Sequence, residues 1–399
     1  MNKKKTGNSK FLKAYNEAGI LDLIRTEKAL SRAELSKLTG LSPTAAGTIV
    51  SSLMEKEYIH EKGTGQSSGG RKPVLLELKP GSYYSIGLDV DVGGISYMLV
   101  DITGRIIDQG VTKLPDSEQE RVISTINNCV AELVEGNSIE VSRLLGVGIS
   151  VPGMVDASTH RVLLAPNLDW EDFDLSGELW KKLKLNVYIE NEAMASAIYE
   201  NWIGSCQQVH NFVCINIKSG IGAGIFAGGK VYRGSGGIAG EIGHIVVDEN
   251  GPKCGCGNYG CLETFAATGR IVEKARKIVR QGVVSSLNNL PNADDINFED
   301  VVDAARMGDE AARNLFNEAA RYLGIALSNI INTLDPSKIV LGKDFAEYGE
   351  LVMGTLRGVV DRRSLKRTNS RVDISISRLG DKSSAMGAAI IPLKVLFGR

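Results

Sequence analysis

Four residues, His244, Cys254, Cys256 and Cys261, have the types and spacing of a metal site. They follow the pattern His-x9-Cys-x-Cys-x4-Cys, and glycines between the cysteines would let the backbone wrap around one ion. Three thiolates and one imidazole satisfy tetrahedral Zn²⁺ with no open position, which predicts a structural rather than a catalytic site. The alternative is a group of buried free cysteines.

The N-terminal segment has the signals of a helix-turn-helix. Residues 11–26 carry apolar residues at helical spacing, and Ser31 with Glu34 forms a capping box for a second helix that ends at Gly40. Ser42 then caps a third helix. Two short helices around a tight glycine turn are typical of DNA-binding modules. Ile49, Leu53 and Ile59 are expected to face the core. The apolar positions at helical spacing in the first helix include Leu12, Tyr15, Ile20, Leu23 and Ile24.

The third helix would place its first residues in the major groove of DNA. Strands expected at 58–62 and 73–78 flank a loop rich in glycine and serine, which is typical of a wing. The alternative is a helical interaction module with an ordinary hairpin. Candidate DNA contacts are Ser42, Thr44, Ala45 and Thr48 on the helix, and Arg71 and Lys72 on the wing.

Charge separates this segment from the rest of the chain. Residues 1–80 hold 14 basic and 8 acidic side chains, whereas the remaining residues hold 32 and 39. A basic end on an acidic body favours a polyanionic partner for the N-terminal segment. The sequence shows no apolar stretch long enough for a membrane span and no apolar region of a secretory signal, so we expect a cytoplasmic protein.

From residue 84 onward, the sequence alternates strand-like and helix-like segments, which predicts an α/β fold. Within this body, five segments resemble the landmarks of the ROK family of repressors and sugar kinases. They are Gly237–Arg270, VPGMVD at 151–156, APNLDW at 165–170, IENEAMASA at 189–197 and SSAMGAA at 383–389. The resemblance covers nearly all of residues 80–399, and the helix-turn-helix in front is the arrangement of the repressor branch.

The resemblance implies a two-lobed actin/hexokinase-like (ribonuclease H-like) ATPase fold behind a winged helix-turn-helix. We therefore expect three parts. They are a DNA-binding domain at 1–80, a small α/β lobe at 81–190 plus 380–399, and a large lobe at 191–379 with the zinc site.

The resemblance also implies a sugar site. Positions that match Asn191, Glu241, His244 and Glu263 hydrogen-bond the sugar in the family's kinases, and His244 would serve both metal and sugar. We add Glu192, whose carboxylate can read vicinal hydroxyls. Further candidates to line the cleft are Asn167 and Gly153.

Kinase chemistry is not expected. The family's kinases have Asp as catalytic base where this chain has Glu192, which leaves Glu192 as a vestigial candidate. Asp91 and Val92 stand where two phosphate-loop glycines are expected, and a carboxylate there would repel nucleotide phosphates. Lys218 and Lys343 replace residues of two further nucleotide motifs.

These features predict a sugar-responsive repressor that binds operator DNA as a homodimer or homotetramer, with Zn²⁺ as structural cofactor. An ATP-dependent sugar kinase with an added DNA-binding domain is the alternative, and an activator that needs its ligand to bind DNA is a third. The pair Asn191-Glu192 resembles xylose-repressor-like members. Xylose is therefore favoured as effector, while glucose and β-glucosides stay open.

Overall fold

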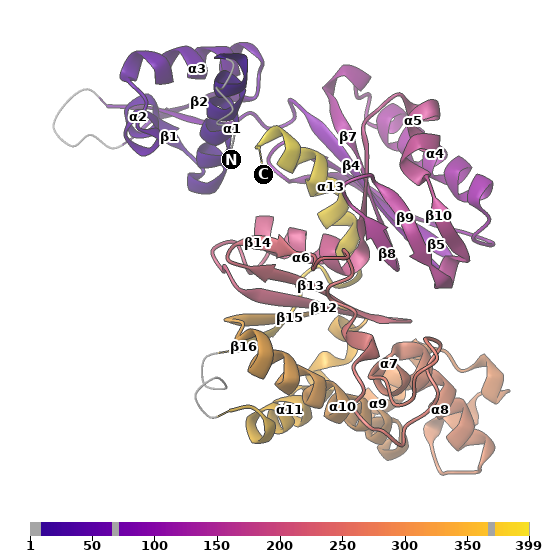
Figure 1. Cartoon of the computed structure of the whole chain (residues 1–399). Coiled ribbons are helices and arrows are strands. Elements are labelled where there is room, and N and C mark those ends of the chain that lie inside the picture. Colours follow the sequence, from indigo (N-terminus) through magenta and orange to yellow (C-terminus); the bar gives the residue numbers. More distant parts are fainter. Residues whose placement is uncertain (1–8, 66–71, 366–371, 399) are drawn as a thin grey trace. The chain divides into compact units, whose positions relative to one another are not determined.

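The computed structural model describes residues 9–65, 72–365 and 372–398. The chain forms two compact units (Figure 1). Unit 1 comprises residues 1–149, 174–189 and 388–399, and unit 2 comprises 150–173 and 190–387. Within the part of the chain that the structure describes, no helix is both long and apolar enough to cross a bilayer.

The N-terminal module of unit 1 is a winged helix-turn-helix. Ser31 and Glu34 form the predicted capping box, Gly40 ends the second helix with φ 71°, and Ser42 caps the third helix. These three local predictions are confirmed. The elements are α1 (Ser9–Glu27), β1 (Leu30–Ser31), α2 (Arg32–Thr39), α3 (Pro43–Glu55), β2 (Ile59–Thr64) and β3 (Val74–Leu78), with strand order β1-β3-β2.

The module's core is smaller than its apolar pattern predicts. Ile20 and Ile24 are fully buried, but Leu12 and Tyr15 are 52% and 70% exposed. Helical spacing alone therefore does not place Leu12 and Tyr15 in the core. Leu21, which the pattern did not single out, is buried in their stead. The residues expected to face the core, Ile49, Leu53 and Ile59, are all buried, which confirms that prediction.

The remainder of unit 1 is built on a five-stranded sheet with strand order β11-β7-β4-β5-β6. The strands are β4 (Tyr84–Asp91), β5 (Gly94–Asp101), β6 (Ile106–Lys113), β7 (Leu144–Val151) and β11 (Val187–Asn191). The helices are α4 (Gln119–Gly136), η1 (Val141–Arg143) and α5 (Leu175–Leu183). Strands β4 and β7 are buried over almost their whole length, because helices cover the sheet.

Unit 2 contains a second mixed sheet with order β14-β13-β12-β15-β16. Every residue of β12 is buried between antiparallel β13 and parallel β15. The strands are β12 (Phe212–Ile217), β13 (Ile221–Ala227), β14 (Lys230–Tyr232), β15 (Lys338–Lys343) and β16 (Asp373–Ile376). A small sheet, β10-β9-β8, is formed by β8 (Met154–Asp156), β9 (Arg161–Ala165) and β10 (Trp170–Phe173).

Helices complete unit 2 and enclose its apolar core, to which the sheet, α10 and α11 all contribute. They are η2 (Pro166–Leu168), α6 (Glu192–Trp202), η3 (Ile242–His244), α7 (Glu263–Ala266), α8 (Thr268–Arg280), η4 (Ser286–Asn289), η5 (Ala293–Asp295), α9 (Phe298–Arg306), α10 (Glu310–Leu334), α11 (Phe345–Arg363) and η6 (Gly380–Lys382). The last helix, α13 (Ser383–Leu396), begins in unit 2 and ends in unit 1. The predicted α/β fold is confirmed.

Candidate functional site

The His/Cys cluster of unit 2 has the dimensions of a metal site. One donor atom each from His244, Cys254, Cys256 and Cys261 lies within 4.8 Å of the others. Cys254 Sγ is 3.7 Å from His244 Nδ1, and Cys256 Sγ is 3.7 Å from Cys261 Sγ. Metal–sulfur bonds of about 2.3 Å place neighbouring ligands of a tetrahedron roughly 3.6–3.8 Å apart. The donor set therefore fits one tetrahedral ion.

The loop around this cluster is folded by its backbone. Asn258 accepts a hydrogen bond from the Cys254 N–H at 2.7 Å, and Gly257 donates back to Cys254 O at 3.0 Å. Gly260 has φ 71°, and a Cβ there would lie 1.6 Å from Asp248 O. Only glycine fits this position, so the tight turn that presents Cys261 depends on it.

A cavity of about 270 Å³ opens beside the cluster and is lined by all seven expected sugar residues. This volume suits a small polar ligand. Its walls come from the small sheet, α6, the β12–β13 turn and the metal loop. The lining residues are Pro152, Gly153, Met154, Leu164, Pro166, Asn167, Asn191, Glu192, Gly220, Ile221, Gly222, Glu241, His244, Gly255, Cys256 and Glu263.

Asn191 is strongly engaged by the protein itself. Its Oδ1 caps α6 by accepting from the N–H groups of Ala193 and Met194, and its Nδ2 donates to Gly153 O at 2.8 Å. An amide nitrogen carries two hydrogens, so one donor of Asn191 remains for a ligand. Asn191 thus holds the β11–α6 corner and the Gly153 loop together at the cavity wall.

Glu241, His244 and Glu263 form the polar side of the cavity. His244 Nε2 lies 4.0 Å from Glu241 Oε2, while its Nδ1 faces Cys254. Burial raises the pKa of Glu241; His244 opposes that rise and Glu263 adds to it. One imidazole therefore connects the metal cluster to a cavity carboxylate, and two carboxylates converge where hydroxyl groups can donate.

The remaining three sugar candidates, Gly153, Asn167 and Glu192, also line the cavity. Gly153 has φ 91°, and a Cβ there would lie 2.3 Å from Leu164 O, so the loop requires glycine. Asn167 is exposed at the rim.

Sequence reasoning missed an ion pair beneath Asn191. Arg233 donates to both carboxylate oxygens of Glu190, at 2.9 and 2.6 Å, and the Glu190 side chain is only 4% exposed. Glu190 also accepts from the Asn191 N–H. No local sequence signal links these residues, since 43 positions separate Arg233 from Glu190.

The residues expected to replace parts of the family's nucleotide-binding motifs lie in two places. In unit 1, Asp91 ends β4 at a tight turn to β5, where it accepts from the Val92 N–H at 2.7 Å and Val92 is 59% exposed. In unit 2, Lys218 lies 3.3 Å from Asp381, and Lys343 lies between Asp381 and Glu192.

The partly buried carboxyl of Asp344, next to Lys343 in the chain, should make the stability of the protein depend on pH. Burial raises the pKa of Asp344 to about 6, and the nearby charge of Asp381 adds to this rise. The charges of Lys218 and Lys343 and a hydrogen bond with Thr268 oppose it. The unfolded chain ionises more easily, so this carboxyl costs stability progressively as pH rises from about 4 to 6. At pH 7.5, Asp344→Asn should raise the free energy of unfolding by up to about 3 kcal/mol. Urea unfolding at pH 5 should show about half that gain, and an equal gain at both pH values would contradict the assignment.

The DNA candidates on α3 are accessible. Ser42, Thr44 and Thr48 are exposed and Ala45 is partly exposed. The Ser42 hydroxyl accepts from the Ala45 N–H at 3.2 Å, and the Thr48 hydroxyl donates to Thr44 O at 3.0 Å. On the wing, Lys72 is exposed, and Arg71 lies outside the described residues.

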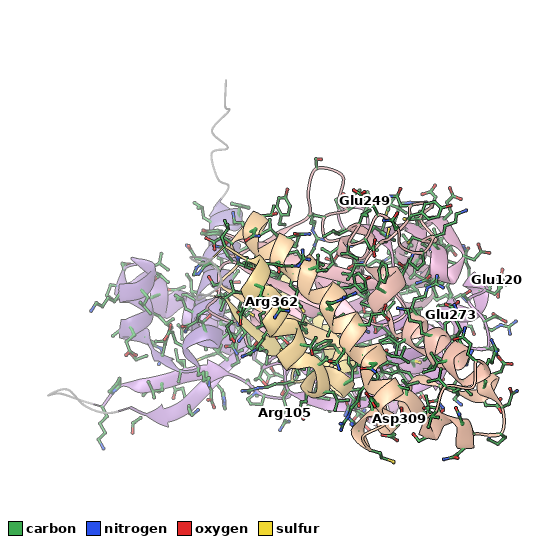
Figure 2. All side chains as sticks on the ribbon, turned by 90° about the horizontal axis from the view of Figure 1, so that it is seen from below. Arg105, Glu120, Glu249, Glu273, Asp309 and Arg362 are labelled. Atoms are coloured by element: carbon green, nitrogen blue, oxygen red, sulfur yellow. The ribbon has the colours of Figure 1, made fainter. Side chains whose placement is uncertain are left out.

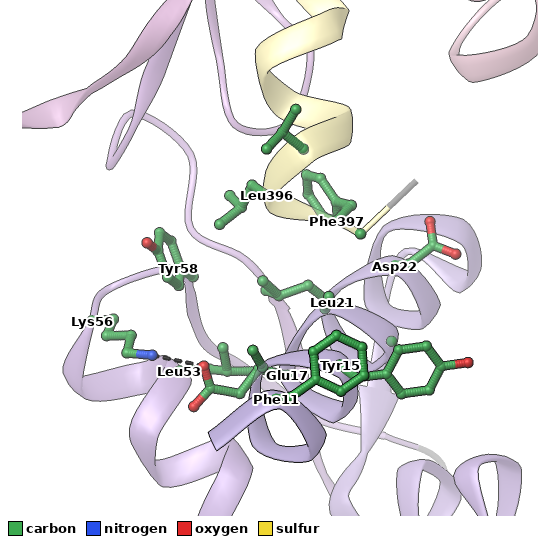
Figure 3. A pocket seen from close by; sticks show the side chains of 15 residues that line it. Phe11, Tyr15, Glu17, Leu21, Asp22, Leu53, Lys56, Tyr58, Leu396 and Phe397 are labelled. Carbon is green, nitrogen blue, oxygen red and sulfur yellow. Dashed lines mark hydrogen bonds and ion pairs between the residues drawn. The ribbon is translucent and has the colours of Figure 1, made fainter. Parts of the chain in front are cut away.

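A larger cavity of about 730 Å³ lies within unit 1, between α1 and the last turn of α13 (Figure 3). Its walls are mainly apolar, with Phe11, Leu21 and Phe397 among them. Glu17 crosses it to accept from Lys56 at 2.7 Å, and it also accepts from Ser52 at 3.1 Å. These contacts fasten α1 to α3 beside the cavity.

Comparison with known proteins identifies the family. The model of the ROK family matches residues 85–395. The chain belongs to the ROK family. It is 33% identical to the "Xylose repressor" of Caldicellulosiruptor bescii, over 96% of each chain.

Solved structures agree with the family assignment. A ROK family transcriptional regulator, described as a homologue of the Escherichia coli MLC protein, matches with a TM-score of 0.85 and 29% identity over 97% of each chain. A ROK family glucokinase from Streptomyces griseus, solved with glucose and AMPPNP, matches with a TM-score of 0.70 and 32% identity. That match covers 77% of this chain and 98% of the glucokinase.

Proposed function

We propose that this chain is a transcriptional repressor that binds operator DNA as a homo-oligomer and changes its DNA affinity when a monosaccharide, with xylose favoured, occupies the unit 2 cavity. One observation carries the proposal. One chain combines a helix-turn-helix, whose third helix begins with exposed hydroxyl side chains, and a cavity in which carboxylates converge. The similarity to a xylose repressor spans both parts. Dimeric binding follows from the two-fold operators that such modules usually read.

Sugar recognition in this proposal uses several cavity groups. Glu241 and Glu263 accept hydrogen bonds from sugar hydroxyls, Asn191 offers its remaining amide hydrogen, and His244 and Glu192 complete the wall. Gly153 and Asn167 frame the entrance. Sugar can alter DNA binding only if it prefers one arrangement of the protein over another.

The cluster beside the cavity holds Zn²⁺ in this proposal, with His244, Cys254, Cys256 and Cys261 as ligands. The soft donor set and the tetrahedral spacing support this metal. When bound, zinc supplies a structural tie for the loop. It also fixes the tautomer of His244, so that Nε2 faces Glu241.

Kinase activity is the second candidate, favoured by the likeness to the glucokinase. Several side chains argue against it. Asp91 places a carboxylate in the β4–β5 turn. Lys343 has a buried side chain at a position where the family's kinases have glycine. Asp344 and Asp381 add negative charge next to it. We therefore propose a sensor without phosphoryl transfer.

A DNA-binding assay tests the proposal directly. DNA fragments are selected from a random library with the full-length protein, and fluorescence anisotropy then measures their affinity with and without D-xylose, D-glucose and other aldoses. We expect tight, salt-sensitive binding that weakens with one sugar. Binding that strengthens with sugar would indicate an activator. No DNA binding together with ATP-dependent turnover of a sugar, at about 1 per second or faster, would establish the kinase.

Glu241→Gln tests the pocket. Losing a charged acceptor for a sugar hydroxyl should weaken sugar binding by about 10- to 100-fold, with little change in DNA affinity. Isothermal titration calorimetry measures the loss. Glu249→Gln is the matched control, because Glu249 is exposed on the surface of unit 2 (Figure 2). Equal affinities of Glu241→Gln and wild type would remove Glu241 from the site.

A further inference from the structure

Lys343 is a fully buried lysine next to the proposed sugar cavity. Its side chain has no exposed area, and its backbone adopts φ 57°, a conformation that glycine accepts more readily. Lysine is almost never fully buried unless it is paired. A residue that is both buried and held in a left-handed conformation calls for a specific role.

The partners of Lys343 come from two different elements. Its Nζ lies 3.8 Å from Glu192 Oε2, at the start of α6, and 3.6 Å from Asp381 Oδ1, in η6. Asp381 has a second cation, Lys218, at 3.3 Å, whereas Glu192 lines the cavity with its side chain 18% exposed. The ammonium of Lys343 is thus shared between a cavity carboxylate and a carboxylate outside the cavity.

The backbone of Glu192 is fixed independently of its side chain. Ser384 donates to Glu192 O at 3.2 Å, and the preceding Asn191 caps α6. The main chain is therefore already set, and Lys343 lies within ion-pair distance of the Glu192 carboxylate. At 3.8 Å the two groups form an ion pair that is longer than a direct hydrogen bond.

We propose that Lys343 is a positioning residue for sugar recognition, which holds the Glu192 carboxylate against the cavity wall. The inference rests on the proposed function. It gives Lys343 a role of its own, because its buried ammonium lies between the Glu192 and Asp381 carboxylates. Glu192 becomes a fixed acceptor for sugar hydroxyls, and its longer side chain, compared with Asp, reaches the buried cation.

Calorimetry with D-xylose on full-length protein tests the role. Lys343→Met should weaken binding at least 10-fold, and Lys343→Arg should restore part of the loss. The double variant Lys343→Met/Glu192→Gln should bind no more weakly than Lys343→Met, because neither half of the pair acts without the other. Lys218→Met is the matched control, since Lys218 contacts Asp381, and it should stay within about threefold of wild type.

Unchanged affinity of Lys343→Met, or independent losses in the double variant, would overturn the proposal. If Lys343→Met does not fold, Glu192→Asp tests the same contact, because the shorter carboxylate withdraws from Lys343. It should also lose at least 10-fold in affinity, and wild-type affinity would overturn the role.

The two proposals fail in different ways. Wild-type protein that binds none of a panel of monosaccharides contradicts the proposed function. In that case, a double-variant cycle in urea unfolding still tests the Lys343–Glu192 pair. Additive effects of the two substitutions on unfolding would show that the residues do not act together.

Discussion

Replacing Cys261 by serine should lower the free energy of unfolding by about 3 kcal/mol or more and abolish sugar binding, because metal binding at such sites is coupled to folding. Cys261 is fully buried, and the chain continues from it through Leu262 to Glu263 in the cavity. A strong chelator should produce the same loss in the wild type. Thermal unfolding with and without chelator, with metal analysis expecting one zinc per chain, measures the effect.

A matched variant separates the metal from simple loss of a thiol. Cys206 is equally buried in unit 2 but lies outside the cluster, near Ser205. Cys206→Ser should keep its zinc and its sensitivity to chelator. A wild-type protein that purifies without metal and unfolds at the same temperature with chelator would contradict the zinc assignment.

The sequence was most informative where neighbouring residues decide the structure. The capping box at Ser31, the Ser42 cap and the glycine that ends α2 depend on contacts within a few residues, and all three occur as predicted. The short spacing of the His/Cys motif likewise brought its donors together.

Contacts between distant segments could not be predicted. How sheets and helices meet decides two such contacts, the Arg233–Glu190 pair and the burial of Lys343 between Glu192 and Asp381. Helical periodicity, in turn, could not show that Tyr15 lies outside the core. Asn191 was expected as a sugar ligand, but its second task as a helix cap became visible only with the Gly153 loop in place.

Two continuous elements connect the cavity side of the chain to the DNA-binding module. Strand β7 runs from the residue after Arg143 to Val151, directly before Pro152 and Gly153 of the cavity. Helix α13 starts with Ser383 and Ser384, the latter bonded to Glu192 O. Its far end packs closely on α1, since a Cβ on Gly398 would lie 2.9 Å from Ala18 Cβ. A change at the cavity can therefore reach the module through covalent structure.

The strand route ends in a compact joint. Glu57, just after α3, accepts from Arg143 and Lys79 at 2.5 Å each, and these partners lower its pKa to about 2. Arg143 also lies 5.4 Å from the centre of the Tyr83 ring, which packs against Tyr58 at 4.6 Å. This joint attaches the chain just after α3 to the start of β7.

Arg143→Gln should uncouple sugar binding from DNA binding. The ion pairs of Glu57 are partly exposed to solvent, so the free energy of unfolding should change little. Sugar affinity and sugar-free DNA affinity should both remain, but the sugar-induced change in DNA affinity should shrink at least about fivefold, the lower end of typical couplings. Anisotropy titrations with and without D-xylose measure that ratio.

Arg105→Gln provides the control, because Arg105 is a largely exposed arginine of unit 1 that pairs with Asp101 at 3.8 Å (Figure 2). It should respond to sugar like the wild type. Glu57→Gln should reproduce the Arg143→Gln phenotype, because it breaks the same joint from the helix side. A full sugar response in both Glu57→Gln and Arg143→Gln would exclude the joint from signal transmission and leave α13 as the remaining continuous route from the cavity to the helix-turn-helix.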